Sequence, residues 1–382
     1  MKIQIITLVL CIVFAHVSAQ ENYKEQKFAT EKVSQNQDTH SVKIYSSNRI
    51  KKKPKNLILF IGDGMGVSHV FAGLTANKGH LFLENFKSVG FSKTQSADDF
   101  VTDSAAGGTA ISTGVKTNNG VIGLDPEGNP VKTILEIAEE EKLATGLVST
   151  SAITHATPAS FIAHQPKRNM YEDIAADFLK TDVDLFIGGG YKHFTDREDR
   201  QDLTKQLIEN DYQVIRTIGE LSKISSGKVA GLIADEHNGR VAERGSNYLS
   251  EATKKAIDIL KNDDDGFFLM VEGSQIDWGG HQNNTGYIVE EMLDLDKAIG
   301  EALKFAEHDG ETLIIVTADH ETGGLGISDG DFATGKVEGE YTTSGHSAVM
   351  VPIFAFGPGA TEFQGIMENT DIFRKMYTAL FK

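Results

Sequence analysis

Short and nearly continuous apolar runs recur along this chain and alternate with segments of helical periodicity. The runs are residues 56–62, 144–150, 184–190, 267–273, 312–320 and 351–359. Strands that are buried on both faces of a parallel sheet have this character. Residues 131–142, 171–180, 251–261 and 287–310 lie between the runs and have helical patterns. The alternation predicts an α/β fold, a three-layer sandwich with a central, mostly parallel sheet flanked by helices.

The chain divides into three parts by composition. Residues 1–19 carry a lysine, a short apolar stretch and a small-residue end, which predicts a secretory signal peptide. The alternative is an uncleaved N-terminal anchor, although the apolar stretch is short for a membrane span. Residues 20–55 are polar and end in the basic run RIKKKPK, which favours a flexible N-terminal arm. Residues 56–382 have no repeat or linker and should form one domain.

Cysteine usage and charge exclude several classes of function. The one cysteine, Cys11, lies within the predicted signal peptide, so the mature chain should have neither disulfides nor a cysteine metal cage. We expect secretion across the inner membrane, a periplasmic or extracellular location and no stable membrane insertion. The net charge of −17 disfavours a nucleic-acid partner. An anionic substrate would need local positive charge from metal ions or arginine.

In the run VTDSAAGGTA, residues 101–110, Ser104 is a candidate nucleophile at the start of a helix. Ser104 follows Asp103 and precedes small residues that can begin a helix. Either Thr102 or Asp103 can cap that helix, and the positive end of its dipole would then face an anion at Ser104. A serine here can also be a plain capping residue. The rest of the chain decides between the two interpretations.

Polar residues follow three of the predicted strands. Asp63 follows the first strand, Glu272 ends another, and Asp319 and His320 end a third. In an open α/β sheet the carboxyl ends of parallel strands line the ligand crevice, so these residues can converge. Any one of them alone would more often be a structural strand-end residue. Together they indicate a site.

The segment EGSQIDWGGHQ has metal-ligand spacing. Asp277 and His281 are four residues apart and would share one face of a helical turn. His346, just before the last apolar run, would by itself be a surface residue. Oxygen and imidazole ligands without sulfur suit catalytic zinc, whereas Asp63, Glu272 and a hydroxyl suit magnesium.

Six motifs together resemble the alkaline phosphatase family: GDGMG, VTDSAAGGTA, THATPASFIAHQPKR, VEGSQIDWGGH, TADHETGG and the SGH of residues 344–346. They spread from residue 57 to about residue 359. The resemblance implies an enzyme that hydrolyses phosphate monoesters to an alcohol and inorganic phosphate through a phosphoserine intermediate. It also implies two zinc ions and one magnesium ion, a crown-type insert that is small here because it must fit within residues 321–345, and a possible homodimer.

The resemblance also implies roles for individual residues. Ser104 would become phosphorylated, Arg168 would grip the phosphoryl oxygens, and Asp103 would orient Arg168. The implied metal ligands are Asp277, His281 and His346 for one zinc, Asp63, Asp319 and His320 for the second, and Asp63, Glu272 and Thr157 for magnesium.

Two positions depart from the pattern of some bacterial members, which have Asp and Lys where this chain has His155 and Trp278. We expect these two residues to surround the magnesium ligands and to change the strength of magnesium binding. Two further histidines, His164 and His237, we expect to be structural or surface residues.

Two rival functions remain open. One is a sulfatase or phosphodiesterase that shares the metal frame. A sulfatase would want a modifiable residue in a C/SxPxR setting, whereas Ser104 is followed by Ala105, Ala106 and Gly107. The other is a non-catalytic phosphate-capturing protein, against which the intact set of nucleophile, arginine and metal ligands argues.

Overall fold

The computed structural model describes residues 30–36, 38–46 and 53–382, and its centre is a ten-stranded sheet. The strands, in spatial order, are β15 (Gly365–Glu368), β3 (Ser88–Lys93), β14 (Val351–Phe356), β9 (Thr312–Thr317), β2 (Asn56–Gly62), β8 (Phe267–Gly273), β4 (Ala144–Ala152), β5 (Leu185–Gly189), β7 (Val229–Leu232) and β6 (Gln213–Ile215). All six predicted apolar runs form strands of this sheet.

Most neighbouring strands in the sheet are parallel, as predicted. The exception is β14, which is antiparallel to both β3 and β9. Its direction follows from its connection. The chain between β9 and β14 contains short strands and no crossover helix, and a parallel return would need such a crossover. The sequence patterns missed β3, β6, β7 and β15, of which all but the six-residue β3 have three or four residues.

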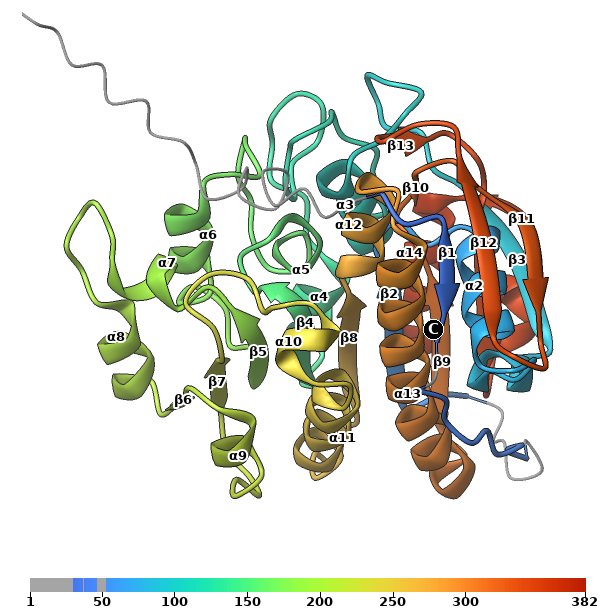
Figure 1. Ribbon diagram of the computed structural model, residues 1–382. Coiled ribbons are helices and arrows are strands. Elements are labelled where there is room, and N and C mark those ends of the chain that lie inside the picture. Colours follow the sequence, from blue (N-terminus) through green and yellow to red (C-terminus); the bar gives the residue numbers. More distant parts are fainter. Residues whose placement is uncertain (1–29, 37, 47–52) are drawn as a thin grey trace, which may run out of the picture.

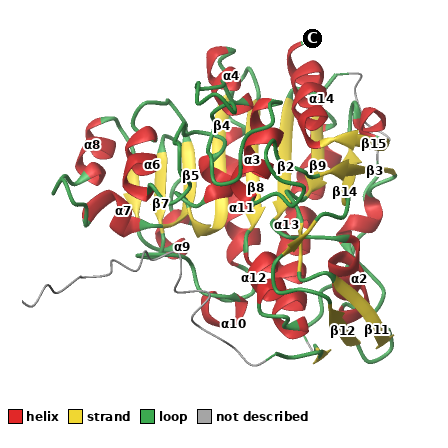
Figure 2. Cartoon of the chain, turned by 90° about the horizontal axis from the view of Figure 1, so that it is seen from above, coloured by secondary structure: helices red, strands yellow, loops and turns green. Residues whose placement is uncertain are grey.

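Helices cover both faces of the sheet, which confirms the predicted sandwich (Figures 1 and 2). Alternate side chains of β2 supply both cores: Ile58 and Phe60 pack on one face, and Leu57 and Leu59 on the other. The first face is covered by α2 (Val67–Ala76), η2 (Phe82–Asn85), α9 (Ile218–Leu221), α11 (Tyr248–Leu260) and α13 (Thr285–Asp309). The second is covered by α3 (Ser104–Thr113), α4 (Ile134–Glu140), α5 (Ala156–Ala159), α6 (Tyr171–Asp177), α7 (Tyr191–Thr195), α8 (Leu203–Glu209), η3 (Ala360–Phe363) and α14 (Asn369–Phe381).

The chain between His320 and His346 forms a small β structure. It contains β10 (Glu321–Thr322), β11 (Leu325–Asp331), β12 (Lys336–Tyr341) and β13 (His346–Ser347). The pair β11 and β12 is an antiparallel hairpin, and β10 pairs with β13. That this hairpin acts as a crown-type insert stays a prediction.

Part of the segment predicted as a flexible arm packs on the body of the fold. Strand β1 (Val33–Gln35) pairs antiparallel with β12. Farther along, His40 Nε2 lies 2.7 Å from Asp296 Oδ2 on α13, and the His40 ring stacks on Phe82 at 5.5 Å. Residues 20–29, 37 and 47–52 of this segment, and the predicted signal peptide, lie outside the described residues. In the described part of the chain, no helix is long and apolar enough to cross a membrane.

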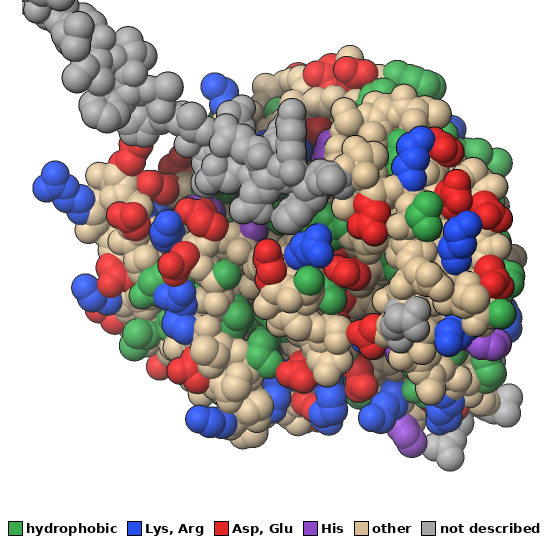
Figure 3. Space-filling model, viewed as in Figure 1, with side chains coloured by type: hydrophobic (Ala, Val, Ile, Leu, Met, Phe, Trp, Pro, Cys, Tyr) green, Lys and Arg blue, Asp and Glu red, His purple; other side chains and the backbone are tan. Residues whose placement is uncertain are grey.

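Charged side chains of both signs are interspersed over the face seen in Figure 3. Screening limits the reach of such mixed surface charge to about 10 Å.

Candidate active site

The candidate residues gather at the carboxyl ends of the central parallel strands. Helices α3 and α12 (Gln275–His281) begin at this edge, above β2 and β8 (Figure 1). The short helix α10 (Val241–Arg244) contacts α13. Strands β2, β8 and β9 are adjacent and parallel. Asp63, Glu272 and Asp319 therefore lie side by side at the carboxyl ends of these strands. The predicted convergence at one sheet edge is what the structure has.

Ser104 is the first residue of α3, and Asp103 caps that helix. Asp103 has an extended backbone, with φ of −101° and ψ of 171°, and its Oδ1 accepts a hydrogen bond from Ala106 N at 2.9 Å. Of the two capping residues that the sequence allowed, Asp103 is the cap. Ser104 is 2% exposed. Its hydroxyl therefore lies in a buried position at the positive end of a helix dipole.

Asp103 also holds Arg168. Its Oδ2 accepts a hydrogen bond from Arg168 Nη1 at 2.9 Å and another from Gly120 N at 3.0 Å. The backbone N–H of Arg168 donates to Gly120 O at 2.7 Å, so one glycine anchors both residues. The guanidinium is thereby positioned beside the start of α3. A planar guanidinium in this place can bind two oxygens of a phosphoryl group.

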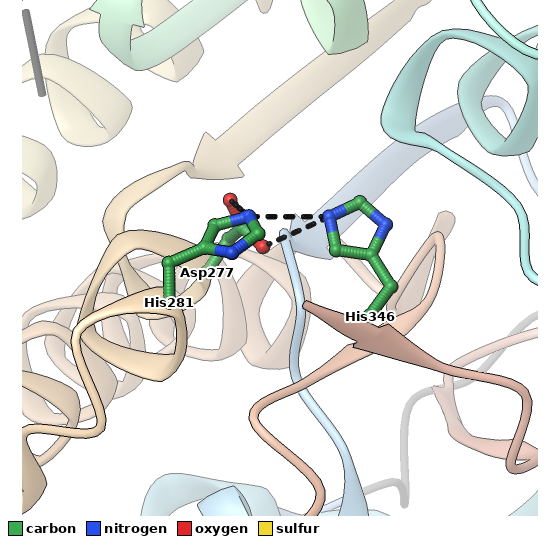
Figure 4. A group of neighbouring side chains, drawn as sticks. All are labelled: Asp277, His281 and His346. Atoms are coloured by element: carbon green, nitrogen blue, oxygen red, sulfur yellow. Dashed lines mark hydrogen bonds and ion pairs between the residues drawn. The ribbon is translucent and has the colours of Figure 1, made fainter. Parts of the chain in front are cut away.

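The first candidate metal cluster consists of Asp277, His281 and His346, whose ligand-type atoms all lie within 4.8 Å of one another. Asp277 and His281 come from α12 and His346 from β13, and the three side chains point toward one another (Figure 4). The Nε2 atoms of His281 and His346 are 3.3 Å apart, and Asp277 Oδ2 is 3.3 Å from His281 Nε2.

The backbone fixes the tautomers of both histidines. His281 Nδ1 lies 2.7 Å from Ser344 O, and His346 Nδ1 lies 2.8 Å from Thr102 O. A carbonyl oxygen only accepts, so both Nδ1 atoms carry protons and both neutral rings present lone pairs at Nε2. Two imidazole lone pairs and a carboxylate then face one point, which is the arrangement of metal-binding histidines.

The second cluster contains Asp63, Asp277 and His320 and lies against Ser104. His320 Nε2 is 3.3 Å from Asp63 Oδ1, 3.4 Å from Asp319 Oδ2 and 3.2 Å from Ser104 Oγ. Thr322 Oγ1 donates to Asp277 Oδ1 and lies 3.2 Å from His320 Nδ1. Because Thr322 Oγ1 donates its only proton to Asp277, it must accept a hydrogen bond from Nδ1–H of His320. The Nε2 atom of the neutral His320 ring therefore also presents a lone pair. A cation bound here would touch the serine oxygen.

The third cluster contains Asp63, Glu272 and His155, again with ligand-type atoms within 4.8 Å of one another. Thr157 Oγ1 donates to Asp63 Oδ2 at 3.3 Å, and Ser149 Oγ donates to Glu272 Oε2 at 2.6 Å. His155 thus stands beside the carboxylates themselves, closer to them than the surrounding position that the sequence suggested. Trp278 is buried next to His155, with the ring centroids 6.3 Å apart.

The carboxylates of this region repel one another. Burial, and then the charge of Asp319, raises the pKa of Asp63 well above its usual range. Burial, and then the charge of Asp277, raises the pKa of Asp319 to about 7. Asp277 is the opposite case: burial works against it, but the nearby His281 holds its pKa well below its usual range. Asp63 and Asp319 therefore share a buried region in which each carboxylate disfavours the charge of its neighbours.

Three buried carboxylate oxygens in these clusters lack a hydrogen-bond partner among the described residues: Asp63 Oδ1, Glu272 Oε1 and Asp319 Oδ2. A buried charge without partners is costly, and divalent cations are the usual compensation. Mixed imidazole and carboxylate donors fit zinc, and the Asp63 and Glu272 oxygens fit magnesium. The donor sets therefore fit the metals that the resemblance implies.

Sequence reasoning missed the residues that orient the candidate ligands. Thr322 connects Asp277 with His320, and the carbonyl groups of Thr102 and Ser344 fix two imidazole rings. Thr322 lies inside the motif TADHETGG, where its hydroxyl could have been noticed. The two carbonyl groups carry no side-chain signal in the sequence.

Comparison with known proteins agrees with this site. Residues 54–341 match the family model for alkaline phosphatase. Alkaline phosphatase 4 of Bacillus subtilis (strain 168) is 34% identical, covering 86% of this chain and 89% of that protein. The solved structure of alkaline phosphatase from the Antarctic bacterium TAB5 is 45% identical, covers 86% of this chain and 99% of its own, and has a TM-score of 0.82.

A variant of that Antarctic enzyme, described with magnesium bound in the M3 site, matches with a TM-score of 0.81 and 43% identity, covering 86% of this chain and 98% of its own. The match to the family model, residues 54–341, contains all the candidate site residues except His346. The chain therefore belongs to the alkaline phosphatase family, whose members are metal-dependent phosphomonoesterases.

Proposed function

We propose that this chain is an exported alkaline phosphatase that hydrolyses phosphate monoesters through a phosphoserine at Ser104, with two zinc ions and one magnesium ion. The observation that carries the proposal is the position of Ser104 Oγ. It lies 3.2 Å from His320 Nε2, at the start of α3, with Arg168 fastened beside it through Asp103. One hydroxyl thus lies beside a candidate metal cluster, a helix dipole and a guanidinium.

The proposed metal ligands are the sets given above, with His155 as an added nitrogen donor near the third position. The described magnesium in the M3 site of the Antarctic relative's variant supports a third metal position in this family. When bound, these cations would lower the pKa of the attacking hydroxyl and neutralise charge on the leaving oxygen.

The proposed reaction has two covalent steps, and both take place at Ser104 while Arg168 binds the phosphoryl group. Ser104 Oγ attacks phosphorus and forms an O–P bond, while the bond from phosphorus to the ester oxygen breaks and the alcohol leaves with a proton. Water then attacks the same phosphorus, the bond from phosphorus to Ser104 Oγ breaks, Oγ regains a proton, and inorganic phosphate is released. Arg168 binds two oxygens of the phosphoryl group throughout, which favours a terminal phosphate over a diester.

We also propose the processing and assembly that the sequence predicts. Residues 1–19 would be removed on export to the periplasm or the medium, and residues 56–382 would be the catalytic domain. A homodimer is a further proposal. The packing of β1 and His40 on the body leaves the described part of the arm as a fixed surface that a second copy could contact.

The test is a substrate and metal panel on the purified mature chain. We expect fast hydrolysis of an aryl phosphate monoester at alkaline pH, little hydrolysis of the aryl phosphodiester or sulfate, loss with chelator, and recovery with zinc plus magnesium. Acid quenching during turnover should trap phosphate on Ser104, detectable by peptide mass spectrometry. Activity that survives full metal removal would contradict the proposal, and preferred sulfate or diester cleavage would favour the rival hydrolase.

A further inference from the structure

Three rings pack at right angles beside the third candidate metal cluster. The ring of His237 is 4.9 Å from that of Trp278 at 79° and 5.4 Å from that of His155 at 85°. His155 and Trp278 are themselves 6.3 Å apart at 89°. His237 touches both residues at which this chain departs from some bacterial relatives, and sequence reasoning expected it to be only structural or superficial.

A backbone hydrogen bond fixes the His237 ring. Its Nδ1 accepts from Ala152 N at 3.0 Å, and a backbone N–H only donates, so the proton of the neutral ring is on Nε2. Ala152 ends β4 and lies three residues before His155. The hydrogen bond therefore ties the His237 ring to the same stretch of backbone that carries His155.

The loop that carries His237 is held from two sides. Gly190 N donates to Glu236 O at 2.6 Å, and Gln275 Nε2 donates to Asn238 O at 2.7 Å. Gln275 begins α12, the helix of Trp278. The backbone on either side of His237 is thus bonded to the residue that follows β5 and to the first residue of α12.

His155 needs this support because it faces two different partners. Its Nε2 lies 3.4 Å from Arg168 Nη2. One of its ring nitrogens also lies within 4.8 Å of a carboxylate oxygen of Asp63 and of Glu272. Its Nδ1 is buried without a hydrogen-bond partner among the described residues. With only the long contact to Arg168 at Nε2 and no hydrogen bond at Nδ1, the orientation of this ring depends largely on packing.

We propose that His237 is a positioning residue for the third metal position, and that its ring, with Trp278, holds the His155 ring between Arg168 and the Asp63–Glu272 carboxylates. The inference rests on the proposed function, since it assumes a metal at that position. In this proposal the ring of His237 limits the His155 ring to one orientation. The hydrogen bond to Ala152 serves to hold that ring in place.

Three substitutions separate the ring from its hydrogen bond. His237→Phe keeps an aromatic ring but loses the acceptor for Ala152 N–H. His237→Asn keeps an acceptor but loses the ring, and His237→Ala loses both. His40→Ala is the matched control, because His40 is also a partly buried histidine stacked on an aromatic ring, but it lies in the N-terminal segment.

The measurement is magnesium binding to zinc-loaded protein, followed through the fluorescence of Trp278, the only tryptophan in the chain. Elemental analysis of metal per chain checks the zinc positions. Supporting residues around metal ligands typically contribute about 10- to 100-fold in affinity. We expect about tenfold weaker magnesium binding in His237→Ala and His237→Asn with zinc content unchanged. His237→Phe and His40→Ala should stay within about threefold of the parent.

Parental magnesium affinity in all three His237 variants would overturn the inference. A loss in His237→Phe as large as that in His237→Ala would also overturn it, because the hydrogen bond rather than the ring would then be responsible. If the parent protein itself binds no metal beyond the two zinc ions, the third position of the proposed function fails, and this inference fails with it.

Discussion

Asp103 uses its two carboxylate oxygens on two different parts of the site. Oδ1 caps α3 through Ala106 N at 2.9 Å, and Oδ2 binds Arg168 Nη1, also at 2.9 Å. The start of the helix that carries Ser104 and the position of the arginine are therefore set by one side chain. Any displacement of this carboxylate would move both.

The fork geometry of Arg168 should matter more than its charge. Arg168→Lys keeps the cation but cannot bind Asp103 and two phosphoryl oxygens at once. Losing one or two charge-assisted hydrogen bonds, at roughly 2–3 kcal/mol in total, should lower kcat/KM by about 30- to 160-fold. Steady-state kinetics on an aryl phosphate measures this. Lys167→Ala, an exposed neighbour, is the control and should be unchanged. Full kcat/KM in the Arg168→Lys variant would remove the arginine from its proposed role.

Removing the hydroxyl of Ser104 should abolish turnover and leave the metals in place. Ser104→Ala should lower kcat by at least about a thousandfold, since the nucleophile is lost. Metal content should stay at the parental value because Asp63, Asp319 and His320 are untouched. Elemental analysis and kinetics on one preparation test both points. Comparable kcat in the alanine variant would exclude a phosphoserine at this position.

Removing His346 should release one metal ion per chain. The ring supplies one of three facing donors, and the remaining Asp277 and His281 would form an incomplete set. His346→Ala should therefore lose about one zinc per chain after dialysis. His164→Ala is the control, because that ring also bonds to a backbone carbonyl, at 2.7 Å from Gly123 O, but is in none of the three clusters. Unchanged zinc in His346→Ala would contradict the first position.

Gly107 permits the close approach of α3 to Asp319. A Cβ at this position would lie 3.0 Å from Asp319 Cβ and 3.1 Å from Asp319 O. Gly107→Ala should displace Asp319 by a few tenths of an ångström, and we expect about tenfold weaker binding of the second zinc, measured by competition with a chelator. Gly219→Ala is the control, because its nearest neighbour would be 3.9 Å away. Equal zinc affinity in both variants would mean that the contact is absorbed elsewhere.

Glu139 should make stability depend on pH. Burial raises its pKa from 4.5 to about 7, opposed by a hydrogen bond from Asp182 N and reinforced by the charge of Asp182. The folded protein therefore holds this proton more tightly than the unfolded chain does. Its contribution to stability is full below pH 4.5, falls between pH 4.5 and pH 7, and is lost above pH 7.

Glu139→Gln removes this titration. Allowing for partial exposure, the variant should be about 1–2 kcal/mol more stable than the parent at pH 8 and nearly equal to it at pH 5. Urea unfolding at fixed zinc and magnesium measures the difference. Glu140→Gln, next to it and exposed, should show no such change with pH. A parent and a Glu139→Gln variant that lose stability in parallel would contradict the assignment.

Local sequence determined a large part of this protein. Nearly continuous apolar runs such as residues 56–62 and 267–273 predict buried strands, and both form strands with the predicted bounds, because burial on two faces selects apolar side chains along most of the strand. The residue types also determined which functional groups the site could contain, namely hydroxyl, guanidinium, imidazole and carboxylate groups without sulfur. The motifs identified the family before any contact was known.

Only the tertiary structure decided how those groups face one another. The carbonyl groups of Ser344 and Thr102 choose the tautomers of His281 and His346, and the packing of His237 places His155 among the carboxylates. The antiparallel direction of β14 likewise depends on its connection and not on its own residues. Patterns along a chain report which side chains are buried, whereas ring orientation and donor direction come from contacts with backbone carbonyl groups and with side chains that are distant in the sequence.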